Sequence, residues 1–157
     1  NGGANRSAVA YLANPADERA RYTDNTNKTM TLLKFTDETG NIGLVNWYAL
    51  HPTAMNYYNR LVSGDHKGYA SLAVEQAHTA ASPAKTGFVA AFAQSDPGDV
   101  TPNINLDNTG PGETDVETTK IMGERQVASA YALFGDIVKE VLGIEKNSLS
   151  FGAQVFD

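Results

Sequence analysis

The chain has 157 residues, the length of one domain, and 41% of them are hydrophobic, which excludes a disordered polypeptide. Its net charge is -6 and it has no basic cluster, which argues against a nucleic-acid partner. It has no cysteine, so thiol chemistry, disulfides and cysteine-ligated zinc are excluded. No apolar run reaches the about 18 residues of a membrane span. Because the chain begins at Asn1 without a methionine, we expect a piece of a longer protein.

Turn and strand signals dominate the first third of the chain. Asn14-Pro15 predicts the start of a short helix that runs to about Arg21, because Asn caps helices and Pro fits the first turn. Residues 30–35 and 42–50 are extended runs on either side of a turn, in which Gly40 can adopt a positive φ. This pattern predicts a β-hairpin. The second run is apolar at nearly every position, which predicts a central strand covered on both faces.

Two polar loops and a helix follow. Residues 51–65 predict a long functional loop, and Asp65 is expected to cap a helix that ends at Ser82-Pro83. Residues 87–93 predict a short buried strand, and residues 94–112 predict a second long loop. The helix is expected to bury the residues at helical spacing, which are Tyr69, Leu72, Ala73, Gln76, Ala77 and Ala80.

The last third predicts one long helix over residues 114–142 and then a strand. Thr114 and Glu117 form a capping box at its start, and Gly143 is the expected stop. A final strand is expected over residues 149–156. The apolar stripe of the helix is Val127, Ala130, Tyr131, Phe134, Ile137, Val138 and Val141. The predicted fold class is α/β, a layered sheet with a β-hairpin and flanking helices, as a fragment of a larger catalytic domain.

Both long loops follow strands, and ligands in such sheets bind beyond the carboxyl ends of strands. His51 directly follows the second strand and is well placed for a metal, although a lone histidine is more often structural. His66 and His78 are expected to be surface residues, and no HExxH motif is present. Ser63 beside Asp65 could suggest a nucleophile, but a turn before a helix explains it better.

The second loop leaves its chemistry open when residues alone are considered. Asp99 could belong to a surface turn or bind calcium, although no EF-hand spacing is present. No complete catalytic set emerges from the residue types and their spacing.

Taken together, several ordered strings resemble the neutral/alkaline ceramidase family over nearly the whole chain. The matching strings are Asn5-Arg6-Ser7, Lys28-Thr-Met-Thr-Leu-Leu-Lys34, Asn46-Trp47 with His51-Pro-Thr-Ala-Met55, Asn59-Arg-Leu-Val-Ser-Gly-Asp65, Lys67-Gly-Tyr-Ala70, Phe88-Val-Ala-Ala-Phe-Ala-Gln94, and Gly98-Asp-Val-Thr-Pro-Asn103 followed by Gly110-Pro111. The resemblance implies that residues 1–157 are an internal section of the catalytic amidase domain.

The resemblance also implies roles for four residues. His51 would be one zinc ligand, and the other ligands, a histidine, a glutamate and a tyrosine, would lie outside this chain. Arg6 matches an arginine that lines the family's active site. Asp99 and Thr101 lie in the family's amidase motif. We expect the four residues to surround one cleft, with the Thr101 hydroxyl facing it near the metal position.

The motif departs from the family at one position, because the family's serine is Thr101 here. Threonine keeps the hydroxyl but adds a methyl group and a stiffer χ1. Direct attack by the hydroxyl would be hindered, whereas attack by a zinc-activated water needs the hydroxyl only for orientation. We favour the second mechanism.

The function implied is a zinc-dependent amidohydrolase that cleaves the N-acyl amide bond of ceramide, giving sphingosine and a fatty acid. The isolated chain is expected to be inactive and to show no fully ligated zinc. The expected partner is ceramide or a related N-acyl lipid, and no nucleic acid is expected. The full-length protein could also associate with a membrane surface. The family implies a secreted or cell-surface location. One alternative is a homologue without ceramidase activity that acts on or binds another lipid or amide, and a second is a non-enzymatic module with accidental motif matches.

Overall fold

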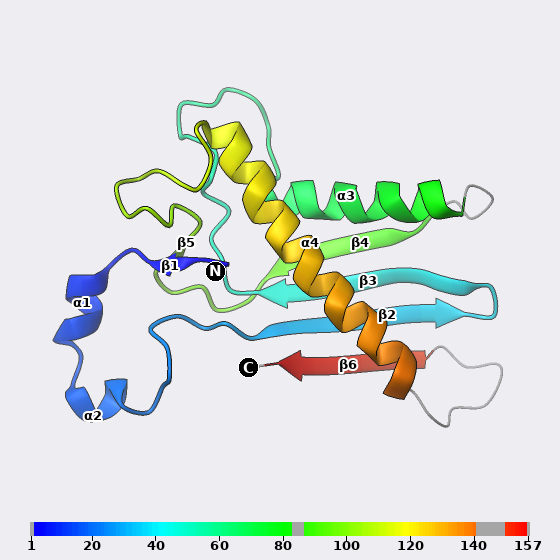
Figure 1. Cartoon of the computed structure of the whole chain (residues 1–157), viewed down its shortest axis with the longest axis horizontal. Coiled ribbons are helices and arrows are strands. Elements are labelled where there is room, and N and C mark those ends of the chain that lie inside the picture. The colour runs from blue at the N-terminus through cyan, green and yellow to red at the C-terminus, as the bar shows by residue number, and fades with distance from the viewer. Residues whose placement is uncertain (1, 83–86, 141–149, 157) are drawn as a thin grey trace.

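The computed structural model describes residues 2–82, 87–140 and 150–156 (Figure 1). Two sheets and four helices form the described part of the chain, which confirms the α/β class. The elements are β1 (Ala4–Asn5), α1 (Ala8–Ala13), α2 (Ala16–Arg19), β2 (Met30–Asp37), β3 (Gly40–Tyr48), α3 (Asp65–Ala81), β4 (Val89–Gln94), β5 (Val100–Thr101), α4 (Asp115–Glu140) and β6 (Ser150–Phe156). No described helix is both long and apolar enough to cross a membrane.

The larger sheet has four strands in the order β4-β3-β2-β6. Strands β2 and β3 form the predicted hairpin, with Met30 opposite Tyr48, and Gly40 has the expected positive φ of 113°. Strand β6 pairs antiparallel with β2. Strand β4 runs parallel to β3, in register from Gly43↔Val89 to Tyr48↔Gln94. The carboxyl ends of β3 and β4 therefore lie at the same edge of the sheet.

Helices α3 and α4 pack on each other and cover one face of this sheet, with α4 crossing it diagonally (Figure 1). The predicted capping box is confirmed at the start of α4. The Glu117 N–H donates to the Thr114 hydroxyl at 3.1 Å, and the Thr114 N–H donates to the Glu117 carboxylate at 3.3 Å. Gly143, Pro83 and Leu149, which the sequence analysis placed at element ends, lie outside the described residues.

The sheet is covered on one face by the described residues, which corrects two expectations. In β3, the side chains of Leu44, Asn46 and Tyr48 are buried, whereas Val45 and Trp47 on the other face are only partly buried. The described residues therefore cover β3 on one face, whereas the sequence predicted that both of its faces are covered.

Strand β4 shows the same alternation. Ala90 and Phe92 are buried in the core, but Val89 is 60% exposed, so this strand is buried on one side rather than throughout. Its alternating pattern fits a strand whose second face has no described layer above it.

Helix α3 is rotated relative to the predicted face. Its buried residues are Asp65, His66, Lys67, Ala70 and Val74, and Leu72 is 54% exposed. The expected stripe is therefore wrong at Leu72, Gln76, Ala77 and Ala80, which are exposed, whereas Tyr69 and Ala73 are partly buried. The stripe was predicted from the spacing of its larger apolar side chains. In the structure, the row that begins with His66 is buried instead.

Both histidines of this helix depart from the surface positions expected for them. His66 is completely buried. His78 is partly buried and stacks on Phe88, with ring centroids 3.7 Å apart and an interplanar angle of 12°. Neither side chain is an ordinary surface residue.

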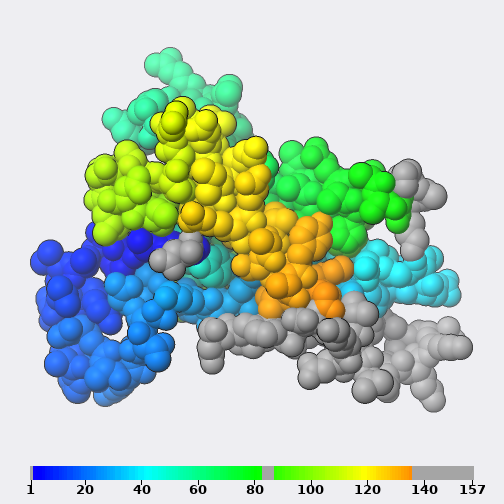
Figure 2. Space-filling model, in the orientation of Figure 1, coloured from blue at the N-terminus to red at the C-terminus, as the bar shows by residue number. Residues whose placement is uncertain are grey.

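The N-terminal segment lies against the second loop. Strand β1 pairs antiparallel with β5, which brings Ala4 opposite Thr101 and Asn5 opposite Val100. The expected helix after Asn14 is only the short α2, and α1 precedes it without having been predicted. In the space-filling view, the N-terminal segment borders the segment that follows β5 (Figure 2).

Candidate functional site

The site lies where the loops after β3 and β4 meet. Because β3 and β4 are parallel, the chain leaves both strands at one edge of the sheet. The His51 N–H then donates to the carbonyl oxygen of Val100 at 3.2 Å, which joins the first loop to the second. This contact brings the two loops together at one edge of the sheet.

The His51 ring is oriented by the second loop. Its Nε2 lies 2.9 Å from the carbonyl oxygen of Gly98. A carbonyl can only accept, so Nε2 carries a proton, and in the neutral ring Nδ1 keeps its lone pair. Metal-ligating histidines usually donate their other ring N–H in this way, so His51 fits the role of one zinc ligand through Nδ1.

The remaining ligands would have to come from elsewhere. Within residues 2–82, 87–140 and 150–156, no three histidine, cysteine, aspartate or glutamate side chains lie close enough together to hold a metal ion. A zinc site normally uses three or four protein ligands. The described residues therefore form no complete site from these four residue types.

Arg6 and Asp99 lie side by side at this edge. The Arg6 N–H donates to the Asp99 carbonyl oxygen at 3.0 Å, and Arg6 Nε lies 3.6 Å from the Asp99 carboxylate. The two side chains are 54% and 44% exposed, so the guanidinium keeps donors for another group. The pairing of β1 with β5 is what carries Arg6 to this position.

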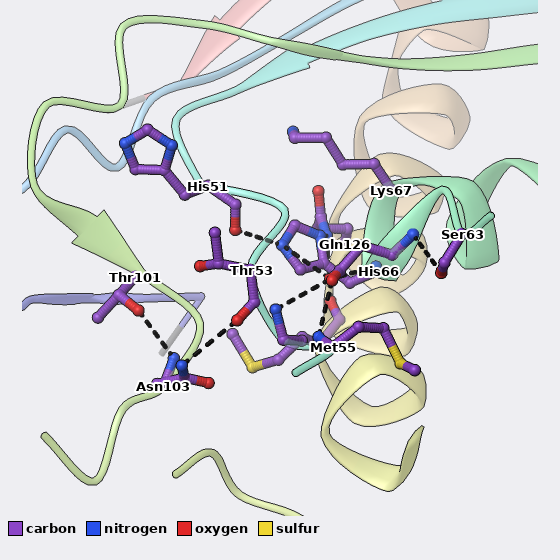
Figure 3. A network of polar contacts seen from close by, with 12 residues as sticks. His51, Thr53, Met55, Ser63, His66, Lys67, Thr101, Asn103 and Gln126 are labelled. Carbon is purple, nitrogen blue, oxygen red and sulfur yellow. Dashed lines mark hydrogen bonds and ion pairs between the residues drawn. The ribbon is translucent and has the colours of Figure 1, made fainter. Parts of the chain in front are cut away.

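Thr101 is the last residue of β5 and lies two residues after Asp99. Its side chain is only 4% exposed, and its hydroxyl accepts a hydrogen bond from the Asn103 N–H at 3.2 Å. The hydroxyl is turned toward Asn103 and away from the His51 ring (Figure 3). This contact closes the turn after β5, and the expectation that the hydroxyl faces the metal position stays a prediction.

Asp65 holds the loop that carries His51. Its carboxylate accepts hydrogen bonds from the N–H groups of Ala54 at 3.2 Å and Met55 at 2.8 Å. The prediction that Asp65 caps α3 is wrong in detail, since Gly64 occupies the capping position. Asp65 has a φ of 52°, a left-handed conformation that aspartate tolerates better than most residues.

His66 lies between this loop and α4. Its Nε2 is 2.8 Å from the carbonyl oxygen of His51, and its Nδ1 is 2.8 Å from Nε2 of Gln126 (Figure 3). The first contact requires an N–H and the second an acceptor, so the ring is the neutral Nε2–H tautomer. Burial, the largest effect, lowers the pKa of His66 and favours the same neutral form.

Lys67 connects the two strand ends. Its ammonium group donates to the carbonyl oxygens of Tyr48 and Ala93, both at 3.0 Å. Tyr48 is the last residue of β3 and Ala93 is the last but one of β4, so both carbonyls lie just before the loops that carry the site. Burial lowers the pKa of Lys67 to about 8.

The roles of His66, Lys67 and Gln126 were not among the expectations drawn from the sequence. One signal could have revealed the first: His66, Ala70 and Val74 recur every four residues, which is the spacing of a buried helix face. Polar residues at the start of that row then require partners, because buried polar groups are nearly always hydrogen-bonded. Gln126 left no comparable local signal.

The comparisons with known proteins decide the family. The model of the family "Neutral/alkaline non-lysosomal ceramidase, N-terminal" matches residues 1–152. The chain belongs to this family. The resemblance drawn from the ordered strings is thereby confirmed.

Relatives support the same assignment. The chain is 40% identical to the neutral ceramidase of Pseudomonas aeruginosa over 145 residues, which cover 91% of this chain and 21% of that protein. It is 39% identical to the neutral ceramidase of Drosophila melanogaster over 162 residues, which cover 87% of the chain and 23% of that protein. The chain thus spans less than a quarter of the length of these relatives.

Solved ceramidase structures share the fold. One described as "Ceramidase complexed with C2" aligns with a TM-score of 0.73 at 38% identity, covering 86% of this chain and 20% of that chain. The crystal structure of neutral ceramidase from Pseudomonas aeruginosa aligns with a TM-score of 0.72 at 39% identity, covering 86% of this chain and 21% of that chain.

Proposed function

We propose that the full-length protein containing this chain hydrolyses the N-acyl amide bond of ceramide with the help of zinc, releasing sphingosine and a fatty acid. The observation that supports this most is the meeting of His51, Arg6 and Asp99 at one edge of the sheet in a member of the ceramidase family. Zinc would supply Lewis acidity that polarises an amide carbonyl and acidifies a water molecule.

The residues of this chain would bind and orient. His51 would offer Nδ1 to the metal while Gly98 holds its other nitrogen. Arg6 would donate to the oxygen on which negative charge develops, with Asp99 setting the direction of its guanidinium. Thr101 would shape the turn after β5, since its hydroxyl is already engaged by Asn103. This role suits attack by water rather than by the hydroxyl.

Hydrolysis of a different N-acyl lipid is a second candidate. It rests on Thr101, which stands where the family motif has serine and adds a methyl group to the segment beside the site. A panel of ceramide, other N-acyl sphingolipids and N-acyl ethanolamines distinguishes the two candidates, because each predicts a different preferred substrate under otherwise identical conditions.

The test uses the full-length protein and a ceramide that carries a fluorescent acyl chain. We expect hydrolysis that a chelator abolishes and added zinc restores. His51→Ala should abolish it, while His78→Ala should retain it, because His78 lies in the helix-sheet core rather than at the loops. Hydrolysis that persists after complete metal removal, or an active His51→Ala variant, would contradict the proposal.

A further inference from the structure

We propose that Asp65, His66 and Lys67 form a latch at the start of α3 that positions His51 for metal binding. This inference rests on the proposed function, because it assigns His51 a metal-ligating role. The three residues are consecutive, and each holds a different part of the segments that lead to the site. They are positioning residues, since none needs to touch the substrate.

Asp65 fixes the far end of the His51 loop. Its carboxylate accepts from the N–H groups of Ala54, Met55 and His66, so both oxygens are used. The left-handed backbone at Asp65 turns the carboxylate toward the loop. A non-glycine residue keeps such a conformation only where its surroundings enforce it.

His66 fixes the near end of the loop. The His51 carbonyl oxygen accepts from His66 Nε2, and Gln126 of α4 holds the opposite ring nitrogen. The His66 ring is fully buried, so no bulk water can replace either partner. The tautomer that donates to His51 is therefore set from α4, which the ring connects to the loop.

Lys67 fixes the strand ends from which both loops depart. It donates to the last part of β3 through Tyr48 and of β4 through Ala93. Its side chain is 8% exposed. A buried ammonium group between two strand ends keeps their spacing, and with it the spacing of the two loops.

The latch acts on His51 specifically because three contacts define the position of that residue. Its N–H is held by Val100, its carbonyl by His66 and its ring by Gly98. Removing His66 frees the peptide after His51 while the other two contacts persist. The peptide that follows His51 can then vary in position, which widens the range of ring orientations that the Gly98 contact still allows, and metal affinity depends on the orientation of a ligating ring.

The experiment compares His66→Leu, His66→Gln and Val74→Ala in the full-length protein. Leucine fills the space without hydrogen bonds, whereas glutamine can place an amide N–H where Nε2 lies. Val74→Ala is the matched control, because Val74 is equally buried on the same row of α3 and its side chain has no group that can form a hydrogen bond. Zinc dissociation constants come from competition with a chromogenic chelator, and amide hydrogen exchange is followed over residues 51–56.

We expect His66→Leu to weaken zinc binding about 10- to 100-fold and to lower kcat with little change in KM. Exchange over residues 51–56 should accelerate, and glutamine should restore most of the affinity. Val74→Ala should leave zinc affinity unchanged even though it lowers the unfolding temperature. If His66→Leu matches Val74→Ala in zinc affinity, kcat and exchange, the latch is refuted. If the wild-type protein binds no zinc and hydrolyses no ceramide, the proposed function is refuted. The role of the latch in metal binding is then refuted as well, because it rests on that function.

Discussion

Arg6 and Asp99 are joined twice, by a backbone hydrogen bond of 3.0 Å and by a side-chain ion pair of 3.6 Å. The backbone contact extends the β1-β5 pairing and places the two side chains on the same side of the site. Both are about half exposed, so the ion pair itself contributes little to stability. The ion pair instead orients the Arg6 guanidinium.

Arg6→Ala should therefore separate activity from stability. We expect the free energy of unfolding to change by less than about 1 kcal/mol. Ceramide hydrolysis should fall by about a hundredfold or more if Arg6 donates to the developing oxyanion. Urea denaturation and steady-state kinetics of the full-length protein check both. Arg21→Ala is the control, since the Arg21 side chain forms an exposed pair with Asp17. Equal activities of the two variants would remove Arg6 from the site.

Thr101 variants test whether its hydroxyl attacks the substrate. Thr101→Val deprives the Asn103 N–H of its acceptor, which should cost about 1 kcal/mol and lower turnover strongly. Thr101→Ser keeps the acceptor and should retain turnover close to that of the wild type if water attacks. A large gain with serine would instead favour direct attack. Full activity of Thr101→Val would show that the hydroxyl has no role.

Lys67 should make stability rise at alkaline pH. Its folded-state pKa is about 8, below the ordinary value of 10.5, so between these values the unfolded state binds more protons. The penalty of burying the charge is complete below pH 8 and is relieved as the pH rises toward 10.5. We expect the wild type to gain about 2 kcal/mol relative to Lys67→Met between about pH 7.5 and about pH 9.5.

Urea midpoints of the two proteins across this pH range measure the effect. The comparison cancels the titration of all groups that both proteins share. A stability difference that stays constant with pH would contradict the prediction, and so would a wild type that loses stability relative to Lys67→Met as the pH rises. Either result would mean that burial does not lower the pKa of Lys67.

Two glycines of α4 should respond in opposite directions to alanine. A Cβ at Gly123 would lie 2.9 Å from the His66 carbonyl oxygen and 2.5 Å from the Tyr69 ring, whereas one at Gly135 would meet nothing within 4 Å. Gly135→Ala should stabilise the protein by about 0.5–1 kcal/mol, because alanine favours the helix. Gly123→Ala should destabilise it by about 1–3 kcal/mol, because α3 and α4 must separate. Thermal melting of both variants checks the signs, and stabilisation by Gly123→Ala would contradict the close packing.

The sequence itself determined the elements whose signals are local. The turn at Gly40 between two apolar runs predicted the hairpin, and the capping box of Thr114 and Glu117 predicted the start of α4. The order of the strings from Arg6 to Asn103 identified the family, because many short matches in sequence are specific even where each is weak. These features depend on neighbouring residues, so the chain alone reveals them.

Only the tertiary structure decided which face of α3 is buried and what its first turn does. Leu72 belonged to a plausible apolar face but is 54% exposed, because the row from His66 to Val74 is buried instead. That choice depends on the close approach at Gly123 and on the partner Gln126, which lie far away in the sequence. A buried histidine is stable only when both ring nitrogens find partners, and those partners come from segments that the fold alone brings together.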